Sequence, residues 1–266
     1  MTQTVVSIGG TLGRVGTIAT NVFREVIRDR ILYLIGFYAL ALMLAGRLLP
    51  EIAATTEKKI LLDLSLAMMS VLGLVIAVFV GTGLVNKEIE KRTVFVLIAK
   101  PVSRTEFIIG KHWGLSAVLA VLVAAMTAIA ILILLFYQVP FSVRDILISS
   151  SFLFSQLSLI TAVAIGFGVF TSSLLAILFT FAVYFMGQLS RDLVTLGKLA
   201  KNPSIESVTR GLYLVLPDLA RLDLKNQAAY HLIPNADVLV GNALYALVYI
   251  VLVLTIASLI FSTREF

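Results

Sequence analysis

Residues 86–112 read NKEIEKRTVFVLIAKPVSRTEFIIGKH and separate two long apolar runs, 62–85 and 113–137. The stretch gathers charges in a chain of which 59% of the residues are hydrophobic and only 14% are charged. Soluble domains carry about 25% charged residues. The composition therefore indicates an integral membrane protein in which residues 86–112 lie in water.

The apolar runs predict how the chain crosses the membrane. A helix that spans about 30 Å of hydrocarbon needs about 20 apolar residues. This length predicts an all-α, polytopic membrane protein, with residues 1–266 forming a single transmembrane domain. The six predicted transmembrane helices are 31–49, 62–85, 113–137, 146–170, 174–189 and 238–261. Only three residues separate the fourth and fifth helices, so we expect a tight hairpin there.

The N-terminal residues 11–30 form a further predicted element. Apolar residues recur there at helical spacing, with Arg and Glu on the opposite side, which favours an amphipathic interfacial helix on the membrane surface. Its basic residues predict a cytoplasmic N-terminus by the positive-inside rule. Six crossings then return the C-terminus to the cytoplasm and place the 86–112 loop there as well.

The stretch 190–237 falls on the extracytoplasmic side by the same parity. It also carries Lys and Arg, which conflicts with the rule, but long loops count weakly in it. Asn202 followed by Pro203 is a strong helix start, so we expect short amphipathic helices in this stretch. Two roles remain open: the helices gate or receive a substrate, or they cover the ends of the transmembrane helices.

Several chemistries have no residues to support them. The chain has no Cys and only two His, so no His/Cys metal cluster is expected. Gly110 and Lys111 lack the earlier Gly and the following Ser or Thr of a phosphate loop, and neither HExxH nor GxSxG occurs. We expect no enzyme activity and no bound cofactor. The basic residues flank apolar runs, so lipid headgroups rather than nucleic acid are the expected contact.

An ion-coupled secondary transporter is one open alternative. Such proteins usually keep an ionisable residue at membrane depth, and none stands in the middle of the six predicted helices. Hydroxyl and amide side chains do occur there. They mark a possible translocation path, or merely helix packing: Ser151, Ser155, Ser158, Thr180, Tyr184 and Gln188.

The 86–112 loop itself has a predicted shape. Residues 88–97 favour a short helix with Val94 and Leu97 on one side, and Pro101 disfavours helix at Lys100. A second helix is expected after Ser103, with Glu106 completing a capping box. The result is a turn that presents a small apolar surface ringed by charge, which suits a groove on a soluble partner. The alternative is a solvated loop that only marks topology.

A family resemblance rests on these residues. The string EIEKRTVFVLIAKPVSR (88–104), followed by Gly110 and Lys111 at the start of a predicted span, resembles the cytoplasmic loop of type-2 ABC exporter permeases. Within that family it is most similar to the branch of multi-copper-enzyme-maturation permeases, related to the permease of nitrous oxide reductase maturation. FREVIRDR (23–30) and the tail REF (264–266) extend the resemblance to nearly the whole chain.

The resemblance implies a multi-pass permease of a prokaryotic inner (plasma) membrane. It implies a second permease subunit, usually an identical copy, and two separate cytosolic ABC ATPase subunits that bind ATP and Mg. It also implies a coupling helix that contacts the ATPase, formed here by Glu88, Glu90, Lys91, Arg92, Val94, Leu97, Lys100, Pro101, Ser103 and Arg104. A third possibility is a non-transporting subunit for membrane assembly or mechanotransmission, because some family members serve partners that use ATP to drive events outside the membrane.

Overall fold

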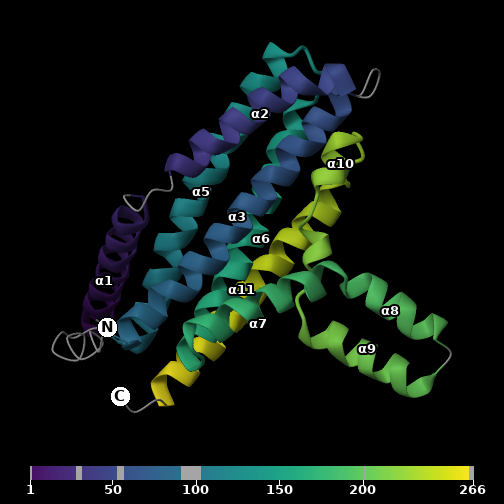
Figure 1. Cartoon of the computed structure of the whole chain (residues 1–266). Coiled ribbons are helices and arrows are strands. Elements are labelled where there is room, and N and C mark those ends of the chain that lie inside the picture. The colour runs from purple at the N-terminus through teal and green to yellow at the C-terminus, as the bar shows by residue number, and fades with distance from the viewer. Residues whose placement is uncertain (1, 28–31, 53–56, 91–102, 201, 264–266) are drawn as a thin grey trace.

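The computed structural model describes residues 2–27, 32–52, 57–90, 103–200 and 202–263, and within these ranges the chain is helical without strands. The long helices lie side by side in one bundle, and two shorter ones project from it (Figure 1). The helices are α1 (Thr2–Val26), α2 (Leu32–Ile52), α3 (Glu57–Glu90), α5 (Arg104–Phe136), α6 (Val143–Phe170), α7 (Ser173–Gln188), α8 (Ser190–Leu199), α9 (Pro203–Val215), η2 (Leu219–Arg221), α10 (Lys225–Ala229) and α11 (Ala236–Thr263).

Helix α6 lies at the centre of the bundle. It packs against α3, α5, α7, α10 and α11, and most of its surface is buried, whereas α11 is mostly exposed. Gly81 of α3 lets the α3 and α6 backbones approach, because a Cβ there would lie 2.9 Å from Cβ of Ala164. Small residues at such contacts are the usual device for packing helices in a membrane.

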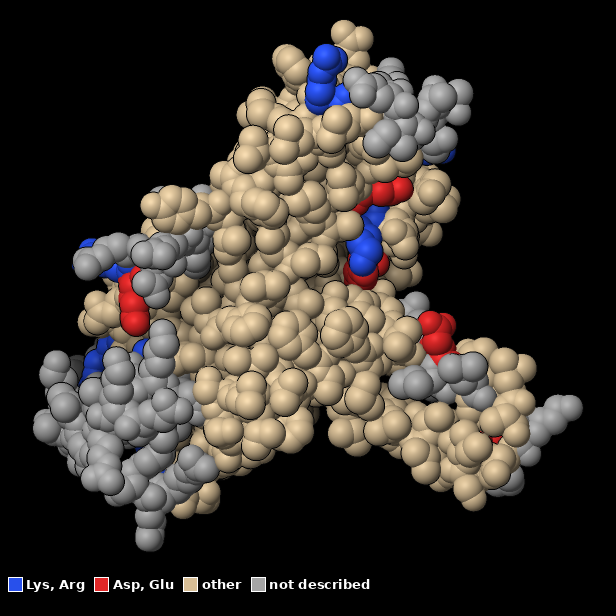
Figure 2. Space-filling model, in the orientation of Figure 1, with Lys and Arg blue, Asp and Glu red and all other residues tan. Residues whose placement is uncertain are grey.

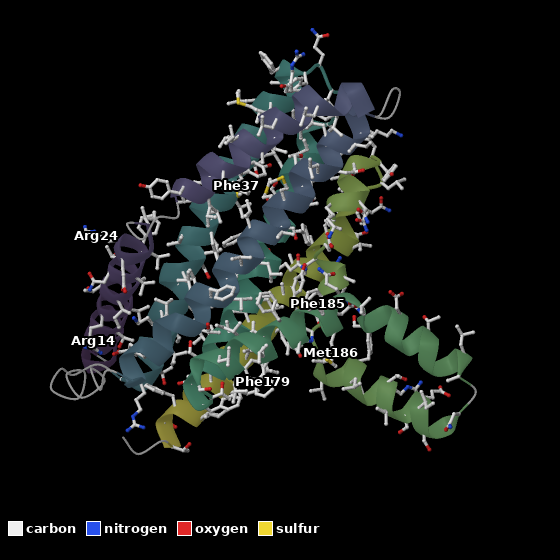
Figure 3. The ribbon with its side chains drawn as sticks, in the orientation of Figure 1. Arg14, Arg24, Phe37, Phe179, Phe185 and Met186 are labelled. Carbon is white, nitrogen blue, oxygen red and sulfur yellow. The ribbon has the colours of Figure 1, made fainter. Side chains whose placement is uncertain are left out.

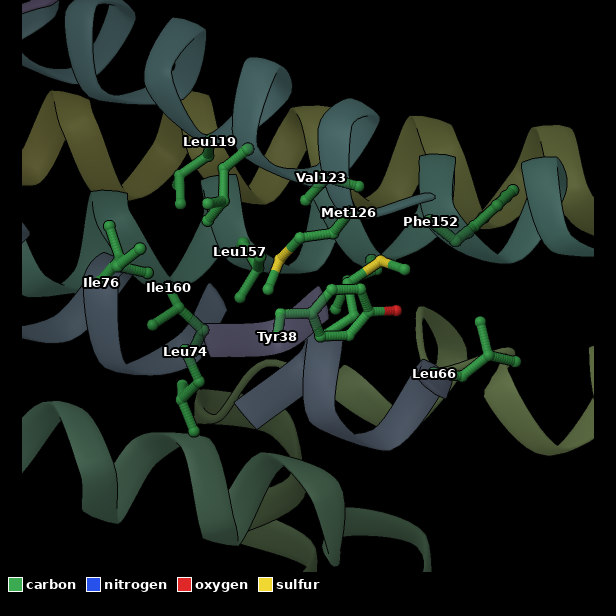
Figure 4. Close-up of a cluster of buried hydrophobic side chains, with 14 of the residues drawn as sticks. Tyr38, Leu66, Leu74, Ile76, Leu119, Val123, Met126, Phe152, Leu157 and Ile160 are labelled. Atoms are coloured by element: carbon green, nitrogen blue, oxygen red, sulfur yellow. The ribbon is translucent and has the colours of Figure 1, made fainter. Parts of the chain in front are cut away.

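The main core fills the space between α2, α3, α5 and α6. Tyr38, Met69, Leu119 and Met126 are fully buried there, and Figure 4 shows side chains of this cluster converging from these helices. The Tyr38 hydroxyl donates to the carbonyl oxygen of Ser65 over 3.1 Å, so the polar tip of this aromatic residue is paired within the apolar core.

Four of the described helices are long and apolar enough to cross a membrane. Their spanning segments are Lys59–Leu84, Arg104–Phe136, Val143–Phe170 and Ala236–Thr263, and two further apolar helices, Tyr33–Leu49 and Ser173–Gln188, are shorter. Figure 2 shows an almost uncharged face over most of the bundle, with charges confined to its ends, one flank and the projecting part. The chain is therefore a polytopic all-α membrane protein, and the crossing of all six predicted helices stays a prediction.

The segment between α7 and α11 has two parts. In the first, α8 and α9 form a hairpin that projects from the side of the bundle (Figure 1). In the second, η2 packs against α7, and α10 packs against α3 and α6. Leu219, Leu222, Leu224 and Ala228 are buried in this second part. The short helices predicted for residues 190–237 are present, and one part of them belongs to the core of the bundle.

Two predicted helix starts are confirmed by their hydrogen bonds. The Ser103 hydroxyl accepts from the Glu106 amide, and the Glu106 carboxylate accepts from the Ser103 amide, which is the predicted capping box. The Asn202 side chain accepts from the Ser204 amide, with Pro203 in the first turn of α9. Both signals are local, which is why the sequence alone sufficed to predict them.

Candidate coupling junction and a buried polar network

The predicted coupling residues fall mostly outside the described ranges. Lys91, Arg92, Val94, Leu97, Lys100 and Pro101 lie there, so their helix stays a prediction. Glu88 and Glu90 belong to the last turn of α3. Ser103 and Arg104 open α5, and both are exposed. The described part of the site is therefore the beginning of α5, which follows directly on the predicted coupling helix.

The first contact of this junction is with α1. Glu106 accepts two hydrogen bonds from the Arg14 guanidinium, from Nε at 3.0 Å and from Nη2 at 2.7 Å. A bidentate pair of this kind fixes orientation as well as distance. The same carboxylate holds the Ser103 amide at 2.9 Å. Glu106 thus joins the N-terminal helix to the residue at which the predicted coupling loop ends.

Two glycines allow α1 to lie directly against α5. A Cβ on Gly110 would lie 2.8 Å from Cβ of Ile18, and a Cβ on Gly114 would lie 2.7 Å from the carbonyl oxygen of Ala19. Gly110 and Gly114 stand four residues apart, the spacing that brings two helix backbones together in membranes. Figure 3 shows Arg14 and Arg24 on α1 as it runs along this part of the bundle. Whether α1 also lies on the membrane surface stays a prediction.

The second contact of the junction is with the end of α11. Arg104 donates from Nη1 to the carbonyl oxygens of Phe261 and Ser262, both over 2.8 Å. A cation at this position satisfies carbonyl groups that the helix end leaves unpaired. One turn further in, the Phe107 and Phe261 rings stack with centroids 5.7 Å apart, and Ser258 donates to the Thr105 hydroxyl over 2.8 Å.

The third contact is with α6. His112 is buried, and its Nε2 lies 3.0 Å from the carbonyl oxygen of Ser158. The Ser158 hydroxyl lies 3.1 Å from that of Ser116, so two residues one turn apart on α5 hold the same residue of α6. Three helices of the bundle are therefore bonded to the first three turns of α5, and a displacement of these turns acts on all three.

The Arg14 and Glu106 pair makes a testable contribution to this junction. We expect Arg14→Gln and Glu106→Gln to lower the thermal midpoint of the protein in detergent by similar amounts, because each removes the same charge-assisted contact. The double variant should lose little more than either single variant, since coupled residues are not additive. Glu25→Gln, on the exposed side of α1, is the control that should leave the midpoint unchanged. Equal and additive losses from both residues would contradict a direct pair.

A second polar feature lies at the base of the α8–α9 hairpin. Asp218 is buried, accepts from the Ser190 hydroxyl over 3.0 Å, and forms an ion pair with Arg221 over 2.8 Å. Its amide donates to the Tyr245 hydroxyl of α11 over 2.8 Å. The Arg221 guanidinium donates from Nε to this carboxylate and from Nη2 to the Tyr213 hydroxyl over 3.3 Å. This Asp218 network connects the ends of α7 and α9 to α11.

The position of the end of α9 follows from α11. Exposed apolar side chains line this helix from Val238 to Leu259, which at 1.5 Å per residue is about 30 Å, the thickness of the hydrocarbon layer. Tyr249 stands at the middle of this length, and its hydroxyl donates to the carbonyl oxygen of Val215, the last residue of α9. The end of α9 is therefore bonded to the middle of the apolar length of α11, and the extracytoplasmic side of residues 190–237 stays a prediction.

A small pocket lies between α3, α6 and residues 222–225, which follow α9 in the chain. Ser70, Ser149, Gln156, Asp223 and Lys225 contribute its polar lining. The Asp223 carboxylate pairs with the Lys225 ammonium over 2.6 Å. Gln156 is 1% exposed, and its Nε2 has no hydrogen-bond partner among the described residues. The pocket can therefore offer a hydrogen bond to a water molecule or to a polar group of a substrate.

The predicted translocation residues occupy separate places. Ser151 and Ser155 bond to carbonyl oxygens of their own helix, α6, and Ser158 faces α5 as described above. Thr180 is buried and donates to the Ala176 carbonyl oxygen, whereas Gln188 donates to the Tyr184 hydroxyl over 3.4 Å. The structure does not gather these side chains around one cavity, and their role in transport stays a prediction.

The Asp218 network was missed in the sequence because its charged residues, Asp218 and Arg221, stand outside every predicted span. The signal lay in PDLARLDLK, residues 217–225, where Leu alternates with charged residues. The leucines at 219, 222 and 224 are buried, which holds the charges between them against the bundle. The ion pairs then form between neighbours in sequence, Asp218 with Arg221 and Asp223 with Lys225.

Metal chemistry finds no support in the part of the chain that the structure describes, since no group of three His, Cys, Asp or Glu residues there could hold an ion. Comparison with curated proteins finds no match. A family model does match: residues 16–266 fit the ABC-2 family transporter protein. The match begins just after Arg14 and covers the rest of the α1–α5 junction, the long apolar helices and the segment between α7 and α11. The chain thus belongs to the ABC-2 transporter family, as the membrane permease subunit of an ABC transporter that works with a cytosolic ATPase subunit.

Proposed function

We propose that this chain is the permease subunit of an ATP-driven exporter and that the loop between α3 and α5 receives the movement of the ATPase. The observation that carries this proposal is the junction at the start of α5. Glu106, Arg104 and His112 bond it to α1, α11 and α6 respectively. A displacement of the first turns of α5 therefore reaches three helices through direct contacts.

The assembly that we propose contains two copies of this chain and two cytosolic ATPase subunits in a prokaryotic inner membrane, with both termini cytoplasmic. ATP and Mg are bound by the ATPase, and the contact residues are those of the coupling helix, from Glu88 to Arg104. The resemblance of residues 88–104 to the maturation branch of these permeases supports this arrangement and the export direction. The substrate is not part of the proposal.

Replacing Val94 and Leu97 by Asp together tests the coupling helix. We expect membrane insertion to stay normal and the permease-dependent stimulation of the ATPase to fall to the basal rate. The reason is that an unpaired charge is costly in an apolar cleft. The measurement is ATP hydrolysis by the reconstituted complex compared with that of the ATPase alone.

The control for this double variant is Arg92→Asp, because at 3.6 residues per turn Arg92 lies roughly 150° around the predicted helix from Val94 and Leu97. A charge at the rim of an interface should alter stimulation only modestly and in a salt-dependent way. Normal stimulation by Val94→Asp/Leu97→Asp would show that the coupling helix lies elsewhere. Equal loss in Arg92→Asp would show that the two sides of the helix were assigned wrongly.

Two measurements separate this function from the alternatives raised by the sequence. Transport in proteoliposomes that follows an ion gradient without ATP would establish a secondary transporter. Hydrolysis coupled to movement of the junction, with no substrate crossing the membrane, would establish an assembly or mechanotransmission subunit. The proposed exporter requires both ATP and passage of a substrate.

A further inference from the structure

Three buried polar side chains without a hydrogen-bond partner line the small pocket between α3, α6 and residues 222–225. The hydroxyls of Ser70 and Ser149 and the Nε2 atom of Gln156 have no partner among the residues that the structure describes. These residues are 7%, 4% and 1% exposed. A buried polar group without a partner is costly and therefore rare. Three of them around one pocket indicate that the pocket has an occupant.

The other buried hydroxyl groups show that these two serines are exceptional. Every other buried Ser or Thr side chain within the described ranges takes part in a hydrogen bond, with a carbonyl oxygen of its own helix or with another side chain. Ser65, on the same helix as Ser70, donates to the carbonyl oxygen of Leu62 over 2.7 Å. A serine in a helix can thus satisfy its hydroxyl locally. Ser70 and Ser149 do not, and both line the pocket.

The unpaired groups come from two facing helices. Ser149 and Gln156 stand seven residues apart on α6, which is two turns, so they lie on the same face of this helix. Ser70 contributes to the pocket from α3. The residues that line the pocket are buried except Asp223 and Lys225, which are partly exposed. The ion pair of these two residues therefore stands at the mouth of the pocket.

The size and the chemistry of the pocket select its occupant. The space open to the centre of a water molecule is about 10 Å³, and one water molecule needs about 10–15 Å³ on this measure, so a larger polar molecule does not fit. The unpaired atom of Gln156 is a donor, and the Lys225 ammonium stands at the mouth, so a cation is not suited to the pocket. Water both donates and accepts, and it can therefore satisfy the amide and both hydroxyls.

We propose that one water molecule is bound in this pocket, where it accepts from Gln156 and donates to the hydroxyl oxygens of Ser70 and Ser149. A buried water molecule makes about three hydrogen bonds, which is the number that these side chains offer. The water links α3 to α6 within the apolar core, beneath the ion pair at the mouth. The inference does not rest on the proposed function, since it concerns the fold of this chain alone.

Hydroxyl-radical footprinting of the full chain in detergent tests for this water directly. X-ray pulses split bound water in place, and the radicals oxidise the side chains in contact with it, which mass spectrometry then identifies. Met69 lines the pocket and Met126 does not, although both are fully buried. We expect Met69 to be oxidised several-fold faster than Met126. Equal rates at the two methionines would show that the pocket is dry and would overturn the proposal.

Gln156→Leu is a second test, because a hydrated pocket and a dry pocket predict opposite signs. If water is bound, the leucine displaces it and leaves the two hydroxyls unpaired. The thermal midpoint should then fall by a few degrees, and the oxidation of Met69 should slow several-fold. In a dry pocket the same change only removes an unpaired buried donor, so a raised midpoint would contradict the proposal.

Ser70→Ala and Ser65→Ala form a matched pair on α3. Ser70→Ala removes one partner of the water, so it should shift both readouts in the same direction as Gln156→Leu. The Ser65 hydroxyl bonds within its own helix, so Ser65→Ala should leave both readouts unchanged. Equal effects of the two substitutions would mean that the Ser70 hydroxyl has no special partner, against the proposal.

Discussion

Gly114→Ala is expected to destabilise the protein by about 1–3 kcal/mol, the usual cost of overpacking a close contact. The new Cβ would lie 2.6 Å from Cβ of Val22 and 2.7 Å from the Ala19 carbonyl oxygen. A backbone atom cannot move aside without shifting its helix, so α1 must separate from α5. Thermal unfolding in detergent, followed by circular dichroism, measures the loss.

The matched control is Gly16→Ala on α1 itself. A Cβ at Gly16 would meet nothing within 4 Å, and Ala is favoured over Gly in a helix by up to about 1 kcal/mol. The same chemical change should therefore stabilise the protein at one position and destabilise it at the other. A neutral effect at Gly114 would show that α1 does not rest on α5 in the way described.

Asp218→Ala should cost about 3 kcal/mol, at the lower end of the range for breaking a buried ion pair, because Arg221 is partly exposed. The substitution removes the carboxylate that pairs with the Arg221 guanidinium. It also removes the acceptor of the Ser190 hydroxyl. The free energy of unfolding in detergent gives the magnitude. Asp192 is an exposed carboxylate on the α8–α9 hairpin, so Asp192→Ala should have little effect on stability.

The double variant Asp218→Leu/Arg221→Met distinguishes a charge effect from a packing effect. Replacing both members of a buried pair by apolar residues is often neutral or stabilising, so much of the lost stability should return. A double variant as unstable as Asp218→Ala would mean that the hydrogen bond from the Ser190 hydroxyl to the Asp218 carboxylate, rather than the charge balance, holds the base of the α8–α9 hairpin.

Local signals in the sequence were reliable where one residue answers another a few positions away. The Ser103–Glu106 capping box and the Asn202–Pro203 helix start both formed as expected. The junction of α5 could be predicted only in part. Glu106 was recognised as a capping residue, but its bond to Arg14 joins residues 92 positions apart, and no periodicity within either helix specifies such a partner.

The burial of the segment after α9 could not be predicted from runs of apolar residues. Such a prediction averages hydropathy over a stretch of sequence, so it assigns charged residues to loops and loops to water. In the structure, short-range ion pairs neutralise Asp218 and Asp223, and buried leucines between them supply the apolar surface that draws the segment inward. Packing of this segment against α3, α6 and α7 is what buries it. Composition alone does not predict that packing.

The central position of α6 bears on how motion in this protein should be measured. Because α6 contacts α3, α5, α7, α10 and α11 and is mostly buried, neighbouring helices can slide past it at far less cost than it can be displaced among them. We expect α6 to be the stationary reference when the transporter changes state. Pairs of distance probes with one member on α6 would then report the movement of each surrounding helix separately.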